Sequence, residues 1–116
     1  MKSALSLTDA DFVTIPALCS RNRDYSARAD AYIPGIVNLL AANANVIMAK
    51  PFGPRDSNGK DVFEEHVKTK LHDDVGVPLA NIHFLDDWDS YHRELGEVHC
   101  GTNARRTPHA NVRWWR

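Results

Sequence analysis

The sequence predicts a fold of the α/β class, because short apolar runs typical of strands alternate with an amphipathic helical segment. Residues 46–49 and 82–85 are rich in apolar side chains, and each run is followed by charged residues. Between them, Phe63, Val67 and Leu71 recur at every fourth position, which places them on one face of a helix. Strands and helices that alternate along a chain are typical of α/β architectures.

The helix between these two strands has recognisable ends. Asp61 is a suitable N-cap and is followed three positions later by Glu64, while Val75 continues the apolar face. Gly76 and Pro78 then predict the end of the helix. The central part of the chain is therefore expected to form a strand, a helix and a second strand.

The connections around this unit also carry turn signals. Residues 52–59 contain Pro54 and end in Ser-Asn-Gly, so we expect an exposed loop there. After the second strand, residues 90–95 are expected to form a helical turn that leads into Gly96.

Further elements are expected nearer the N-terminus. Residues 12–15 form a β-branched and aromatic run that predicts a strand ending at Pro16, since proline cannot donate a ladder hydrogen bond. Cys19 is expected to pack in the interior, and residues 21–28 are polar and predict a surface loop. Pro34 is suited to the first turn of another helix. The apolar face of that helix would contain Ile36, Val37, Leu39 and Leu40.

Composition indicates one compact unit that is not a dedicated nucleic-acid or membrane protein. The chain has 116 residues, 43% hydrophobic and 25% charged, which is ordinary for a globular domain. Its 14 basic and 15 acidic side chains give a formal charge of -1 and no field that would attract nucleic acid. No apolar run approaches the roughly 20 residues of a membrane helix. Two cysteines do not make a disulfide framework, and without a signal-peptide pattern we expect a soluble, cytoplasmic protein.

The stretch with the most chemical content is GEVHCGTN at 96–103. Cys100 is followed by Gly101, and glycine allows backbone conformations in which a bulky substrate can approach the sulfur. His99 precedes the cysteine, but neighbouring side chains rarely point the same way. Taken alone, the pattern leaves two alternatives open, a nucleophilic cysteine or a small buried thiol.

The octapeptide does not stand alone. It is followed by two arginines at 105–106, Pro108 and two tryptophans at 114–115, and it is preceded by Lys-Pro-Phe-Gly-Pro at 50–54 and Asp-Asp at 86–87. In this order the motifs resemble the C-terminal part of the protein-arginine deiminases, hydrolases that convert peptidyl arginine to citrulline. The resemblance covers nearly the whole chain.

The resemblance implies a fold and a place in a larger protein. It implies a pentein, or α/β propeller, in which ββαβ-type modules surround a central channel. Residues 1–116 would supply the last module and part of the preceding one, as the C-terminal segment of the catalytic domain. We then expect the missing N-terminal modules to be partners of this chain, and self-association through the faces that they would cover.

The resemblance also implies the chemistry. In the family a cysteine attacks the guanidinium carbon of a peptidyl arginine and forms a thiouronium, a histidine acts as acid and base, and two aspartates bind the guanidinium. Of this set, only the cysteine has a counterpart here, as Cys100. Gly96, His99, Gly101 and Asn103 are expected to support its loop. Calcium is implied for the full-length enzyme, although this chain shows no calcium-binding pattern and no cofactor site.

Other residues of types that often form sites have simpler expected roles. His72 and its neighbours at 73–74 are expected to be solvated residues at a helix end. Asp86 and Asp87 are expected to cap residues 90–91 or to hold Arg105. Glu94 and Leu95 fall where the family varies at the substrate mouth. A solvated basic tail is expected to be formed by Arg105, Arg106, Arg113 and Arg116. The expected apolar anchors of the C-terminus are Trp114 and Trp115.

Two further hypotheses compete with the enzyme. A zinc protein would draw on residues of metal-ligand type, but the spacing contains no Cys-x-x-Cys or His-x-x-x-His element. The candidate zinc ligands would be His83, His92, His99 and Cys100. A non-catalytic deiminase-like module for binding or assembly would explain the absence of the histidine and aspartates, so this alternative stays open.

Overall fold

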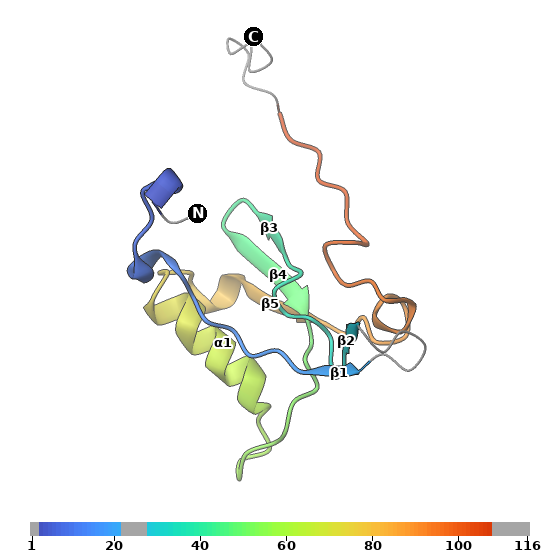
Figure 1. The fold of residues 1–116 in the computed structure, drawn as a ribbon. Coiled ribbons are helices and arrows are strands. Elements are labelled where there is room, and N and C mark those ends of the chain that lie inside the picture. Colours follow the sequence, from blue (N-terminus) through green and yellow to red (C-terminus); the bar gives the residue numbers. More distant parts are fainter. Residues whose placement is uncertain (1–2, 22–27, 108–116) are drawn as a thin grey trace.

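The computed structural model describes residues 3–21 and 28–107, and within them it shows a mixed α/β arrangement of two sheets and one α-helix (Figure 1). The α/β class predicted from the sequence is confirmed. The elements are β1 (Cys19–Arg21), β2 (Ala29–Ala31), β3 (Leu40–Ala42), β4 (Asn45–Ala49), α1 (Val62–Asp73) and β5 (Ile82–Leu85). Short 3-10 helices lie at Ser3–Leu5, Asp9–Asp11, Leu79–Asn81 and His92–Glu94.

The larger sheet has the strand order β3-β4-β5. β3 and β4 form an antiparallel hairpin in which Leu40 lies opposite Ile47, whereas β4 and β5 are parallel, with Val46 opposite Ile82. α1 is the crossover between the two parallel strands, as parallel pairing requires. The strands predicted at 46–49 and 82–85 are therefore confirmed. β1 and β2 form a separate antiparallel pair.

The ends of α1 follow from the residues predicted to set them. The Asp61 carboxylate accepts hydrogen bonds from the backbone N–H groups of Phe63 (2.9 Å) and Glu64 (3.1 Å), which satisfies two donors of the first turn. It also accepts the N–H of Gly53 at 2.6 Å and so ties the preceding loop to the helix. Beyond the helix, Gly76 has a φ of +80°, a conformation that glycine adopts without strain.

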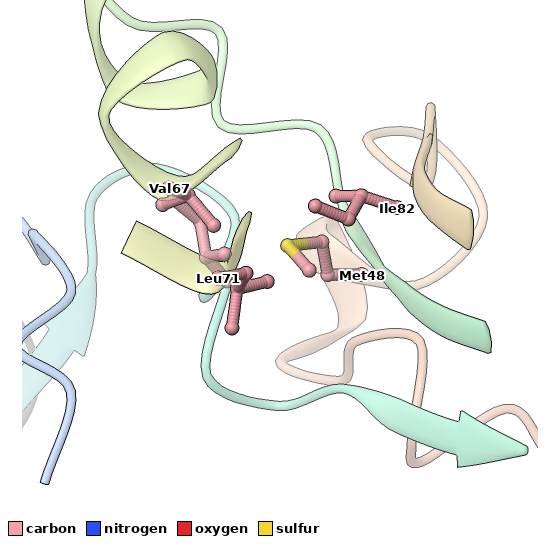
Figure 2. Close-up of a cluster of buried hydrophobic side chains, with 5 residues drawn as sticks. Met48, Val67, Leu71 and Ile82 are labelled. Carbon is pink, nitrogen blue, oxygen red and sulfur yellow. The ribbon is translucent and has the colours of Figure 1, made fainter. Parts of the chain in front are cut away.

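The core lies between α1 and the larger sheet. Figure 2 shows that Val67 and Leu71 from the helix point toward Met48 of β4 and Ile82 of β5. Met48 and Val67 are 0% exposed, and Ile36 completes the buried cluster. Burying such side chains contributes roughly 1.5–3 kcal/mol each. The apolar face predicted from the four-residue spacing is thus the face that holds the helix on the sheet, although Val75 lies beyond the helix and is exposed.

Three expectations for the N-terminal half are wrong. Residues 12–15 do not form a strand, and the first strand among the described residues, β1, begins only at Cys19. No helix follows Pro34, because a turn is closed by the Asn38 N–H donating to the Gly35 carbonyl, and the next residues pair with β4. Pairing in the sheet overrides the helix-like apolar spacing here.

Cys19 was expected to be buried, but it is exposed on the two-stranded β1–β2 sheet, where short strands leave little to cover it. The exposed loop at 52–59 and the helical turn before Gly96 are both present. Most of the loop predicted at 21–28 lies outside the described residues. In the part of the chain that the structure describes, no helix is long and apolar enough to cross a membrane.

Candidate active site

The cysteine predicted as the nucleophile lies on a tight turn of residues 96–101, called the cysteine turn below. The chain reaches this turn from β5 through the 3-10 helix His92–Glu94 and Leu95, whose φ is +63°. Gly96 donates its N–H to the Tyr91 carbonyl at 3.0 Å, and Gly101 donates to the Glu97 carbonyl at 3.1 Å. The Gly101 bond therefore closes the turn, and the Gly96 bond ties its start to the segment that precedes it.

The Cys100 thiol is exposed and is contacted by Asn38, which comes from the turn before β3. The Asn38 Nδ2 group donates to Cys100 Sγ at 3.4 Å, while Asn38 Oδ1 accepts the His99 N–H at 3.0 Å. The same Oδ1 atom also lies 3.9 Å from Cys100 Sγ, so the nitrogen end of the amide is the one closer to the sulfur. Sequence reasoning missed this residue, because its only signal is one amide among apolar side chains, 62 positions away from the cysteine.

These contacts act on the ionisation of the sulfur. A hydrogen bond from the main chain of Glu97 and the Asn38 amide lower the pKa of the Cys100 thiol below its usual value, and the negative charge of Glu97 opposes them. The thiolate is the nucleophilic form of cysteine. An exposed thiol with a lowered pKa can attack an electrophile that reaches it, so the alternative of a small buried thiol is wrong for this position.

The glycines of the cysteine turn have steric roles. A Cβ atom at Gly101 would overlap the ring of Tyr91, since it would lie 2.6 Å from Cε1 of the ring and 2.8 Å from the hydroxyl oxygen. A Cβ atom at Gly96 would lie 3.6 Å from the Cys100 Cβ, which is ordinary contact. Gly101 was expected to give a substrate room beside the sulfur. The structure shows a different role for this glycine, because the Tyr91 ring occupies the space that a Gly101 side chain would need.

The other predicted loop residues lie nearby. His99 acts through its main chain, because its carbonyl accepts hydrogen bonds from the Thr102 hydroxyl at 3.0 Å and the Thr102 N–H at 3.2 Å. Asn103 is exposed. Arg106 donates to the Ala41 carbonyl at 2.9 Å and connects the chain after the cysteine turn to β3. Arg113, Arg116, Trp114 and Trp115 lie outside the described residues.

Buried ionisable groups lie beneath the cysteine turn. Asp87 and Glu97 are only 4% and 7% exposed, and the His92 Nδ1 lies 2.9 Å from Glu97 Oε1. Burial, first, and the nearby Glu97 carboxyl, second, raise the pKa of Asp87 to about 6. The expectation that the Asp87 side chain caps residues 90–91 is wrong, since its carboxyl oxygens have no hydrogen-bond partner and its main-chain carbonyl accepts the Tyr91 N–H.

The remaining candidates have simple surroundings. Asp86 accepts the Trp88 N–H at 3.2 Å, which is a local turn contact. His72 is exposed at the end of α1, with Nδ1 3.0 Å from the Val77 carbonyl oxygen. Leu95 is 78% exposed beside the cysteine turn. Among the described residues, no three histidine, cysteine or acidic side chains are grouped to hold a metal ion.

Comparison with known proteins gives the family. The site is a cysteine with a lowered pKa on a tight turn that follows β5 in the chain. The family model described as Protein-arginine deiminase (PAD) matches residues 1–116. The chain is 39% identical to rat protein-arginine deiminase type-4 over 117 residues, which cover 99% of this chain and 17% of that protein. It is 38% identical to mouse type-3 and 37% identical to human type-4, each over 99% of this chain and 16% of the relative.

The chain therefore belongs to the protein-arginine deiminase family, as the resemblance of its motifs implied. It spans only 16–17% of the length of these relatives.

Proposed function

We propose that residues 1–116 form the C-terminal, nucleophile-bearing segment of the catalytic domain of a protein-arginine deiminase, a pentein in which earlier modules complete the channel. The reaction is hydrolysis of a peptidyl-arginine guanidinium to citrulline and ammonia. The observation that carries the proposal is the exposed Cys100 thiol, whose pKa is lowered by the main chain of Glu97 and by Asn38. Membership of the family supplies the class of substrate.

The first half of the reaction uses this thiol. The Cys100 thiolate attacks the guanidinium carbon, and the carbon–nitrogen bond to one terminal nitrogen breaks after that nitrogen has gained a proton, so that ammonia leaves. The product is a thiouronium bound to the cysteine. The Asn38 Nδ2 group, 3.4 Å from the sulfur, holds the thiolate before attack. A positive guanidinium placed next to the sulfur would stabilise the thiolate further.

The second half releases citrulline. Water adds to the thiouronium carbon, the carbon–sulfur bond breaks, and the thiolate is regenerated as the urea group of citrulline forms. This step needs a base for the water, and the first step needs carboxylates that bind the guanidinium in a bidentate manner. Asp87 and Glu97 are not suited to that task, because they are buried beneath the turn and directed at each other rather than at solvent.

The isolated chain is therefore expected to be inactive. The histidine and the two aspartates of the family would come from the missing modules. Large apolar side chains that lie exposed are consistent with such a partner surface, among them Tyr32 (64%), Val37 (63%) and Leu95 (78%). Calcium would be required by the complete enzyme and held by segments outside this chain, so no step is assigned to it here.

The test measures citrulline released from an arginine peptide with calcium and with a chelator. The preparations are the isolated chain, the longer parent protein, and the parent with Cys100→Ala or, as a matched control, Cys19→Ala. We expect activity only from the parent and from the Cys19→Ala variant, with chelation abolishing it. A parent that releases no citrulline, or a Cys100→Ala variant that keeps its activity, would contradict the proposal.

The second candidate function is a non-catalytic deiminase-like module for binding or assembly. The observation that favours it is the burial of Asp87 and Glu97 beneath the cysteine turn, which keeps both of these carboxylates from binding a guanidinium in front of the thiol. Mixing the chain with the remainder of the parent catalytic domain separates the two. Restored citrulline formation supports a split enzyme, whereas a complex without activity supports the binding module.

A further inference from the structure

Three ionisable side chains lie buried together under the cysteine turn. Asp87 follows β5, His92 opens the 3-10 helix His92–Glu94, and Glu97 is the second residue of the turn. Asp87 and Glu97 are 4% and 7% exposed, and the His92 side chain is 10% exposed. They are called the acid–histidine cluster below. The cluster joins the end of the sheet to the segment that carries Cys100.

The hydrogen bonds of the cluster are incomplete when both acids are ionised. Glu97 Oε1 lies 2.9 Å from His92 Nδ1, but Glu97 Oε2 and both carboxyl oxygens of Asp87 are buried without a hydrogen-bond partner. Buried polar atoms of this kind are rare, because each costs about 1–3 kcal/mol. The carboxyls of Asp87 and Glu97 lie close enough to share a hydrogen bond once one of them carries a proton. A single proton would therefore satisfy an oxygen on each side.

The cluster is enclosed from several sides. The Trp88 ring packs on the His92 ring with 4.9 Å between centroids. Asp30 of β2 lines a pocket together with His92 and Glu97, so another acid faces the cluster from the smaller sheet. The neighbouring Arg93 bonds Asp89 at 3.2 Å on the exposed side of its helix. His92 is thus the basic group paired with the buried acids.

Glu97 connects this cluster to the thiol in two ways. Its carbonyl accepts the N–H of Gly101 at 3.1 Å and closes the cysteine turn. Its main chain also donates the hydrogen bond that contributes most to lowering the pKa of the Cys100 thiol, while its side-chain charge acts in the opposite direction. Any displacement of Glu97 therefore changes both the position and the ionisation of the nucleophile.

We propose that protonated Asp87 donates a hydrogen bond to the Glu97 carboxylate, and that this acid pair, held by His92, positions the cysteine turn and so sets the reactivity of Cys100. Asp87, His92 and Glu97 are then positioning residues, because they act on the substrate only through Cys100. The inference rests on the proposed role of Cys100 as the nucleophile.

The hydrogen bond between Asp87 and Glu97 depends on pH. Burial and the Glu97 carboxyl raise the pKa of Asp87 to about 6, so the shared proton is held below that pH and lost above it. After its loss, two buried carboxylates repel each other beside a single imidazole. We expect Glu97 to shift, the turn to loosen and the thiol to lose part of its main-chain hydrogen bond. The fraction of Cys100 in the thiolate form then rises less steeply with pH than it would for a thiol that titrates independently of other groups.

The test uses iodoacetamide alkylation of the 116-residue chain between pH 5 and 9, with the rates at Cys100 and Cys19 separated by peptide mapping. Asp87→Asn places a permanent amide donor opposite Glu97. In the wild type, we expect the plot of Cys100 alkylation rate against pH to change slope near pH 6. In Asp87→Asn, we expect the plot to follow the titration of the thiol alone. At pH 7.5 the variant should react about threefold faster, because its thiol keeps the main-chain hydrogen bond that favours the thiolate. Superimposed profiles would overturn the proposal.

Variants of His92 separate positioning from folding. His92→Ala should slow alkylation of Cys100 by about threefold, whereas His92→Asn, whose amide can stand where Nδ1 stood, should restore the wild-type rate to within about twofold. Equal rates in both variants and the wild type would contradict the role of His92. The exposed Cys19 should keep its profile throughout, which shows that the change in rate is confined to Cys100.

Alkylation by a small electrophile requires no citrulline formation, so the two proposals fail separately. A parent enzyme without deiminase activity would leave the alkylation profiles unchanged and overturn only the proposed function. Identical profiles for the wild type and Asp87→Asn, in a parent that releases citrulline, would overturn only the positioning role. Circular dichroism of each variant at each pH confirms that differences in rate arise from a folded chain.

Discussion

Replacing Asp87 by asparagine should change how stability depends on pH. In the folded chain, burial raises the pKa of Asp87 from its usual 3.8 to about 6, so the folded state binds more protons than the unfolded state between these values. The stability of the wild type must then fall as the pH rises through this window. At about 1.4 kcal/mol for each pKa unit, the loss amounts to about 3 kcal/mol. Below pH 3.8 and above pH 6 this group adds no further slope.

The assay is urea unfolding of both proteins from pH 4 to pH 8, followed by tryptophan fluorescence. The free energy of unfolding of Asp87→Asn, relative to the wild type, should rise by about 2–3 kcal/mol between pH 4 and pH 7 and then stay level, because asparagine does not titrate. Asp86→Asn is the matched control, since the Asp86 side chain is exposed and accepts a single local N–H. A flat difference for Asp87→Asn, or one equal to that of the control, would refute the assignment of a shared proton.

Three other substitutions test the contacts that build the site. Asn38→Ala removes the amide donor to the sulfur and should raise the thiol pKa, so alkylation of the cysteine turn at pH 7 should slow; an unchanged rate would contradict the contact. Asp61→Ala leaves three backbone N–H groups without their acceptor and should lower the free energy of unfolding, measured by urea titration, by about 2–3 kcal/mol. The control Asp56→Ala, at an exposed turn, should lower the free energy of unfolding by less. Gly101→Ala should displace the Tyr91 ring and reduce alkylation and citrulline formation in the parent; equal rates would show that the ring moves freely.

The parts of the fold that the sequence predicted are those with local signals. α1 combines an N-cap at Asp61 with apolar residues at every fourth position, and both features depend only on neighbouring residues. The strands at 46–49 and 82–85 are apolar runs bounded by polar residues. The helix expected after Pro34 failed because its apolar residues meet a partner strand that sequence spacing does not reveal. Local pattern thus predicts elements well where tertiary pairing agrees with it.

The candidate site shows the same division. Cys100 and its glycines could be recognised because they are contiguous, and family motifs surround them. Asn38 could not, since it reaches the sulfur only through a turn 62 residues earlier in the chain. Asp87 was identified as an acidic residue after a strand, but its interpretation as a cap was wrong. Nothing in its immediate neighbours shows that the chain would bury it against Glu97.

The charged groups at the site indicate which parts of the proposed reaction this chain would supply and which would come from other modules. This chain provides a thiol and two donors that stabilise its ionised form, Asn38 and the main chain of Glu97. The nearby carboxylates face inward and position the turn. A guanidinium in front of Cys100 would therefore find no acidic partner in this acid–histidine cluster, and under the proposed function the carboxylates that bind it would come from other modules. Using different acids for substrate binding and for positioning the turn has a physical advantage. Acids that bind a guanidinium must stay ionised, whereas an acid pair that shares a proton needs one of its two carboxyls to be protonated.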